Sequence, residues 1–224
     1  MLIAALLLAT PASAWQAMTV PGSDTEVSWF HTPVTYDIAD DHTLDEASLD
    51  ALDEAFDAWS SVRGADIAFR GGKVIPRQGL AKMDDAHLVF VDHDFPYGDE
   101  VLALAATWAD DHTGEMVHFD LSLNGRVPWG TDGEPDRYDL ATAVSHELGH
   151  VLGLDHTHEV AAVMHADLDL GEVRASLHDD DIAGLRHLYG ATDDAVPFGC
   201  STSRVPALGW LLIAPVALLA RRRS

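Results

Sequence analysis

The sequence predicts one small α+β domain, and two observations support this prediction. Short runs of β-forming residues, separated by Gly, Pro and Asp clusters, surround a single helical segment in the first half of the chain, whereas two helical segments follow in the second half. The 224 residues, with 47% apolar content, suffice for one hydrophobic core but are short for two domains. Because no internal repeat is visible, we expect residues 15–195 to fold as a single unit.

Five runs have the composition of strands. The segment Val34-Thr35-Tyr36-Asp37-Ile38 is the clearest, since its apolar and polar residues alternate. The segment from Leu102 to Trp108 is rich in alanine, which has a lower strand propensity. The expected strands are residues 34–38, 65–69, 87–91, 102–108 and 116–119.

Three segments have the apolar spacing of amphipathic helices. In the first of them, Leu52, Phe56 and Trp59 recur every three or four residues, with acidic residues on the other faces. The expected helices are residues 44–64, residues 138–152 with Asp136 or Asp139 as the N-cap, and residues 179–189 with Gly190 as the stop.

The charge balance and the cysteine count exclude several kinds of site. Thirteen Lys and Arg against 37 Asp and Glu give a formal net charge of −24, which repels a phosphate backbone and argues against nucleic-acid binding. The single cysteine, Cys200, cannot form an internal disulfide and cannot build a thiolate zinc site. A metal ion in this chain must therefore be held by His or carboxylate side chains.

Both ends of the chain differ in composition from its body. Residues 1–14 contain an apolar run followed by Ala12-Ser13-Ala14, a small-residue pattern that signal peptidase accepts, so they predict a signal peptide and export. Residues 196–224 contain the apolar stretch Val205–Ala220 followed by three arginines. This order is typical of a membrane anchor or of a sorting tail that is later removed.

The C-terminal segment resembles the tripartite sorting tails, of the MYXO-CTERM type, found in some Gram-negative bacteria. The resemblance rests on Gly199-Cys200, the apolar stretch and the arginine cluster, in that order. It implies that Cys200 is processed and lipidated, and that the protein ends at a bacterial cell surface or outer membrane or is secreted. The alternative for Cys200 is an inert thiol in a linker.

The strongest chemical signal is the pattern His146-Glu147-x-x-His150-x-x-Gly153-x-x-His156. Two imidazoles four residues apart lie on one face of a helix and can hold one ion. A catalytic zinc needs three protein ligands and an open position for water, so His156 is the expected third ligand. Gly153 can adopt a positive φ, end the helix and turn the chain back toward the metal.

Glu147 favours a catalytic metal over a structural one. A carboxylate next to a ligand can take a proton from the water that a catalytic zinc binds. The residues alone leave a structural zinc site open as the alternative, since three His bind metal in either case.

These residues resemble the metzincin zinc endopeptidases, and their surroundings resemble the matrixin branch. Thr157 directly follows the third His, and Val163-Met164-His165 is similar to the family's Met-turn. Weaker similarities run in order through residues 29–190. The resemblance implies a metzincin-type zincin domain with a twisted, mostly parallel five-stranded sheet, three helices, and an extended peptide bound along an edge strand near residues 102–108.

The chain also departs from the animal matrixins. Their propeptide cysteine plug is not expected, because the domain begins soon after Ala14 and the only cysteine is Cys200. Their structural zinc uses a His-Asp-His-His set; His118 and His93-Asp94 supply members here, but a histidine near residues 104–106 is missing, so we expect hydrogen-bonded or solvent-facing histidines instead. A solvated acidic surface, in a chain with 28 aspartates, is favoured over calcium binding at Asp92, Asp94, Asp110, Asp111 and Asp120.

The sequence therefore favours an exported, monomeric zinc endopeptidase that acts on protein or peptide substrates. The alternatives are a cell-surface zinc-binding interaction module without turnover and a zinc hydrolase that acts on a non-peptide bond. The expected site consists of the metal ligands His146, His150 and His156, the general base Glu147 and the Met-turn residue Met164.

Overall fold

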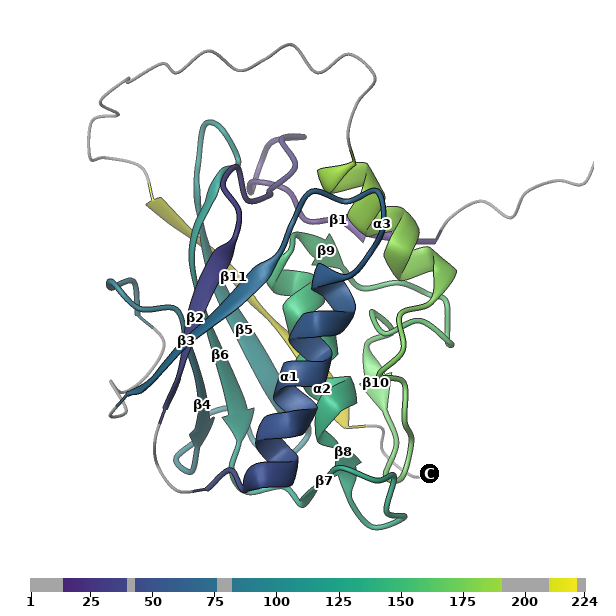
Figure 1. Cartoon of the computed structure of the whole chain (residues 1–224). Coiled ribbons are helices and arrows are strands. Elements are labelled where there is room, and N and C mark those ends of the chain that lie inside the picture. The colour runs from purple at the N-terminus through teal and green to yellow at the C-terminus, as the bar shows by residue number, and fades with distance from the viewer. Residues whose placement is uncertain (1–13, 40–42, 76–81, 191–209, 221–224) are drawn as a thin grey trace, which may run out of the picture.

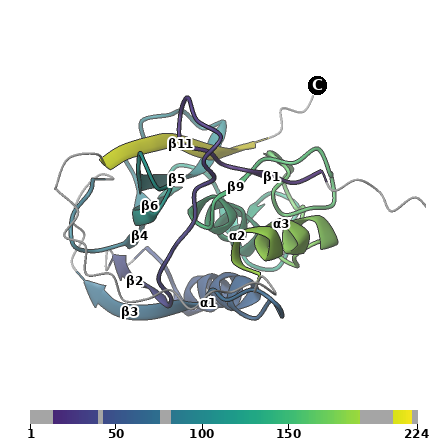
Figure 2. The ribbon, with the colours of Figure 1, turned by 90° about the horizontal axis from the view of Figure 1, so that it is seen from above.

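The computed structural model describes residues 14–39, 43–75, 82–190 and 210–220, and in these ranges a twisted sheet forms one layer with two helices packed side by side on one of its faces (Figures 1 and 2). The helices are α1 (Glu46–Ser60), α2 (Leu140–Val151) and α3 (Asp179–Tyr189). The strands of the sheet, in spatial order, are β10 (Asp167–Leu168), β11 (Trp210–Ala220), β5 (Val101–Asp110), β6 (Met116–Asn124), β4 (Leu88–Asp92), β2 (Val34–Ala39) and β3 (Phe69–Ile75).

Five of these strands form the sheet that the sequence predicts. Strands β3, β2, β4 and β6 are parallel to one another, and β5 runs antiparallel to β6. The α+β class, the three helices and the mostly parallel arrangement of these five strands are thereby confirmed, whereas β10 and β11 extend the described sheet to seven strands. Two short pairs lie outside it: β1 (Gln16–Ala17) with β9 (Leu154–Asp155), and β7 (Trp129–Gly130) with β8 (Tyr138–Asp139).

One strand prediction is wrong in position. Residues 65–68 are irregular, because Asp66 N donates to Tyr189 O at 2.7 Å and Ala68 N donates to Thr32 Oγ1 at 3.0 Å. The strand begins only at Phe69 and runs through two glycines. A Cβ on Gly71 would lie 3.2 Å from Tyr36 Oη, so the missing side chain leaves room for the tyrosine ring.

The helices agree closely with the apolar spacing. The buried face of α1 includes Phe56 and Trp59, and Trp59 Nε1 donates to Ser145 O at 2.9 Å, which joins α1 to α2. Asp139, rather than Asp136, caps α2 by accepting from Thr142 N at 2.8 Å. Helix α3 covers the predicted residues and ends at Gly190, but with φ −69°, so its last turn does not use the left-handed conformation that we expect of a glycine stop.

The C-terminal apolar segment contributes to the sheet. We expect residues 196–224 to stand apart from the domain, whereas residues 210–220 form β11 against β5 (Figure 1). Short apolar runs fit a buried strand and a membrane segment equally well, which explains the difference. Within the described ranges, no helix combines the length and the hydropathy that a membrane span requires.

Candidate metal centre

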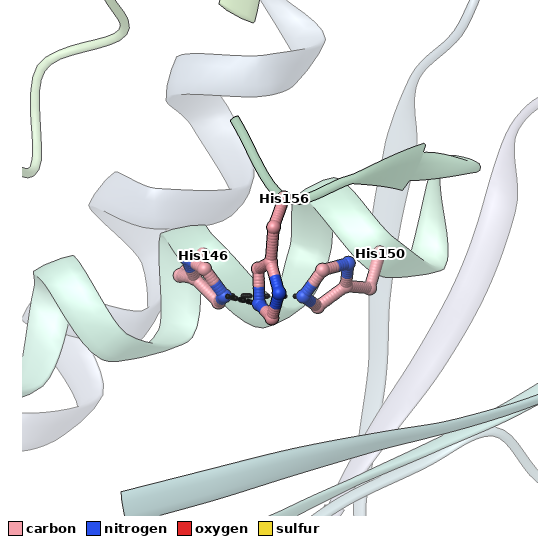
Figure 3. A group of neighbouring side chains, drawn as sticks. All are labelled: His146, His150 and His156. Atoms are coloured by element: carbon pink, nitrogen blue, oxygen red, sulfur yellow. Dashed lines mark hydrogen bonds between the residues drawn. The ribbon is translucent and has the colours of Figure 1, made fainter. Parts of the chain in front are cut away.

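Three imidazoles converge on one point beside helix α2 (Figure 3). His146 and His150 come from α2, and His156 comes from the segment that follows β9. The Nε2 atom of His146 lies 3.1 Å from Nε2 of His150 and 3.2 Å from Nε2 of His156. The structure thus brings together the three histidines that the sequence singles out.

Backbone carbonyls set the direction of two of the rings. Nδ1 of His146 lies 2.7 Å from Val163 O, and Nδ1 of His150 lies 2.7 Å from Leu154 O. A carbonyl only accepts, so each Nδ1 carries the proton and, in the neutral ring, each Nε2 presents a lone pair. Two such lone pairs 3.1 Å apart cannot share a hydrogen bond, and this contact fits two ligands of one cation.

The turn after α2 carries the third ligand back to the first two. Gly153 has φ +94°, and a Cβ there would collide with Val27 O, so no other residue fits the turn without strain. The next residues form β9, whose Asp155 side chain accepts from His156 N at 2.7 Å. Gly153 therefore does what its place in the motif predicts, and Asp155 fixes the backbone of His156, the expected third ligand.

Burial keeps the three imidazoles neutral. It lowers the pKa of His146 well below the usual range, and the neighbouring imidazoles lower that pKa further. Burial and the proximity of His156 lower the pKa of His150 to about 3. The pKa of His156 is also lowered by burial, against the opposing charges of Asp155 and Asp167. Neutral imidazole is the form that binds a metal ion.

The donor set fits zinc. Zinc–nitrogen distances of about 2.0–2.1 Å in a tetrahedron place neighbouring nitrogens about 3.3 Å apart. The observed separations of 3.1 and 3.2 Å between Nε2 atoms lie close to that value. Three imidazoles also leave one tetrahedral position open, as catalytic zinc sites do.

Glu147 lies on the side of α2 that faces the sheet. Its side chain is fully buried, and burial raises its pKa to about 8, although two backbone hydrogen bonds oppose the shift. Oε2 accepts from Ala105 N of β5 at 2.7 Å, and Oε1 accepts from Leu218 N of β11 at 2.9 Å. The carboxylate thus sits where β5, β11 and the metal-binding helix meet.

The segment Val163-Met164-His165 packs against helix α2. Met164 is buried, and a Cβ on Gly149 would overlap its sulfur atom, so the absence of a side chain at position 149 makes room for the methionine. The neighbouring Val163 supplies the carbonyl that orients His146. Met164 therefore packs against the helix that carries His146 and His150, and its Met-turn role stays a prediction.

Two aspartates of α3 bind segments near the three histidines, Asp181 the turn at Val163 and Met164 and Asp180 the residue after His156, and local sequence patterns do not predict these bonds. Asp181 accepts from the backbone N–H groups of Val163 at 2.9 Å and of Met164 at 3.1 Å. Asp180 accepts from Thr157 Oγ1 at 2.8 Å. Helix capping explains only part of their role, since Asp181 also closes a capping box with His178. The one sequence feature that could have pointed to these further hydrogen bonds is that Asp180 and Asp181 lie within residues 29–190, which resemble the matrixins.

The other histidines and acidic residues do not join the triad of His146, His150 and His156. Among the described residues, the only other group with three metal-ligating side chains close together is Asp110, Asp111 and His112. There Asp110 accepts from His112 N and Thr113 N, which is the pattern of an exposed turn. His93 and His118 belong to neither group. Cys200 lies outside the described residues.

Comparisons with known proteins agree with this geometry. Residues 28–190 match the family model described as Matrixin. Human stromelysin-3 is 33% identical over 184 residues, which cover 81% of this chain and 34% of that protein. Metalloendoproteinase 1 of Glycine max is 27% identical over 169 residues (71% and 51%), and human matrix metalloproteinase-16 is 29% identical over 179 residues (75% and 28%). The chain thus spans at most about half the length of these relatives.

Proposed function

Because this chain belongs to the matrixin family, we propose that it is a zinc-dependent endopeptidase that hydrolyses peptide bonds in protein substrates. The observation that supports the proposal most strongly is the convergence of His146, His150 and His156, with Glu147 on the same helix. The family names of the relatives point to the same reaction.

Each residue of the proposed site has its own role in peptide hydrolysis. His146, His150 and His156 would hold the zinc, which supplies Lewis acidity that polarises the scissile carbonyl and acidifies a water molecule. Glu147 accepts the proton of the attacking water and then donates it to the nitrogen of the leaving amine.

Replacement of Glu147 tests this assignment. In zinc-loaded Glu147→Gln we expect kcat/KM for casein or a peptide library to fall by about 10²- to 10⁴-fold, while bound zinc stays unchanged. Glu54→Gln, on the exposed face of α1, is the matched control and should keep full activity. Chelator should abolish cleavage by the wild type. Unchanged cleavage by Glu147→Gln would contradict the proposed role. A zinc-loaded chain that still cleaves no protein after β11 has been displaced would favour the interaction module.

Export and processing complete the proposal. We infer that residues 1–14 are removed as a signal peptide and that the tail from residue 196 is processed at Cys200. Residues 1–13 and 191–209 lie outside the described ranges, so the sequence alone supports this inference. Mass spectrometry of the protein secreted by a bacterial host should find Trp15 as the first residue. A secreted chain that keeps Met1 would contradict it.

A further inference from the structure

We propose that strand β11 is an inhibitor built into the chain: it occupies the edge of β5 where a substrate peptide would bind, and its release frees that edge. This inference rests on the proposed endopeptidase function and concerns its regulation. Three features of the structure carry it, namely the strand pairing, the contact with Glu147 and the burial of Leu218.

The first feature is that β11 is bound on both sides like an added peptide strand. It pairs antiparallel with β5, from Trp210 opposite Asp110 to Leu219 opposite Val101, and it pairs parallel with β10. In the described sheet, β5 has no other neighbour on this side, so without β11 its backbone groups would be unpaired. Addition of an extended segment to such an edge is a general mode of peptide recognition.

The second feature is the hydrogen bond between β11 and the proposed general base. Leu218 N lies 2.9 Å from Oε1 of Glu147. In the proposed reaction this carboxyl group delivers a proton to the nitrogen of the leaving amine, so Leu218 N occupies the place of that nitrogen. The peptide bond between Ala217 and Leu218 therefore lies where the scissile bond of a substrate would lie.

The third feature is an apolar anchor next to the triad. The Leu218 side chain is fully buried against Leu102 of β5, Ala143 of α2 and Leu168 of β10. Its neighbour Leu219 is 39% exposed. Among residues 218–220, the part of β11 whose side-chain burial is described, Leu218 is the fully buried residue and anchors the strand beside α2, whereas Leu219 is exposed.

The position of the strand in the chain makes it an effective but reversible inhibitor. Residues 191–209 tether β11 to the domain, so binding is intramolecular, and a short tether gives effective concentrations of the order of mM. The pairing with β5 is interrupted between Ile213 and Val216, around Pro215, which has no N–H to donate. Cleavage within the tether, as proposed at Cys200, would separate β11 from the domain.

Two substitutions in the full, zinc-loaded chain test the proposal. Leu218→Arg places a charge in the apolar anchor and should release β11, whereas Leu219→Arg changes an exposed side chain of the same strand. We expect kcat/KM for a short peptide substrate to rise at least about 10-fold in Leu218→Arg and to change less than about twofold in Leu219→Arg. Hydrogen exchange at the β5 amides, which does not depend on activity, should accelerate in Leu218→Arg only.

Each contrary result has a separate meaning. If the β5 amides exchange equally in all three chains, β11 does not hold the edge of β5 and the proposal is overturned. If the β5 amides exchange faster in Leu218→Arg but cleavage does not rise above a measurable wild-type rate, β11 binds without inhibiting. That result also overturns the proposal. A wild-type chain that cuts itself between Ala217 and Leu218 would show that β11 is a substrate and not an inhibitor, which overturns the proposal. If Leu218→Arg releases the amides and still cleaves nothing, the proposed function itself is wrong, and the inhibitory role falls with it.

Discussion

This chain has two groups of neighbouring histidines, which offer the same imidazole nitrogens but arrange them differently. In the triad, carbonyls bind the Nδ1 atoms of His146 and His150, so their Nε2 lone pairs face the common point that His156 also reaches. In the second group, the rings of His87 and His118 meet edge to face with centroids 5.0 Å apart.

The nitrogens of the second group are arranged differently. His87 Nδ1 lies 2.7 Å from Thr35 O, whereas the buried His118 Nε2 has no hydrogen-bond partner among the described residues and lies 3.5 Å from Asp120 Oδ1. The Asp120 carboxylate already accepts hydrogen bonds from Lys82 N and Leu88 N. A third histidine, His93, does not join this group, and its Nε2 atom lies 3.1 Å from Thr43 Oγ1. The comparison teaches that the direction of the imidazole lone pairs, not the number of histidines, makes a metal site.

The largest effect expected from this difference is on activity. His156→Gln should lower kcat/KM for a peptide substrate by about 10³-fold or more, because two imidazoles hold zinc poorly. His118→Gln, the same change in the second group, should alter kcat/KM less than about threefold. Steady-state assays at saturating zinc would measure both, and equal losses in the two variants would remove the distinction between the groups.

The support beneath the triad gives the next largest effect. Asp181→Ala leaves the amides of Val163, Met164 and His178 without their acceptor, and we expect the free energy of unfolding to fall by about 3 kcal/mol. Asp179→Ala, an exposed residue of the same helix turn, should cost less than about 1 kcal/mol. Urea denaturation at pH 7 would compare them. Similar losses in the two variants would mean that only helix capping matters here.

The smallest effect concerns the pH dependence of stability at His87. Burial lowers the pKa of His87, and His118 lowers it further, whereas the Thr35 carbonyl and Asp120 raise it. The unfolded chain therefore binds this proton more readily, so the stabilising contribution is present above about pH 6.5 and is lost as the pH falls below that value.

Replacement of His87 should remove this contribution. The free energy of unfolding is compared at pH 7.5 and pH 5.5 in both chains. We expect its decrease between these pH values to be smaller in His87→Gln than in the wild type, by about 0.5–1 kcal/mol. Urea titrations at the two pH values would measure the difference. An identical decrease in both chains would show that folding does not lower the pKa of His87.

Local pattern was enough to predict most of the metal centre. The spacing of His146 and His150 on a helix, and a glycine at position 153, determine how three ligands meet, because helix geometry and positive φ are properties of short segments. The apolar periods of α1 and α3 likewise predict their extents to within a few residues.

Features that depend on distant segments could not be predicted. The capping role of Asp181 is visible in the sequence, but its bonds to Val163 and Met164 exist only because the fold brings that turn to α3. The pairing of β11 with β5 joins segments about a hundred residues apart, and nothing in the apolar composition of residues 210–220 specifies that partner. Register over such separations follows from the assembled sheet and its anchor, Leu218.

The most direct test of the account is the zinc content of three purified chains: wild type, His150→Gln and His118→Gln. Elemental analysis after dialysis against trace zinc should find one zinc per chain in the wild type and in His118→Gln, and almost none in His150→Gln, with unchanged circular dichroism as the control for folding. One zinc retained by His150→Gln, or a zinc lost from His118→Gln, would contradict the assignment of the metal to the triad.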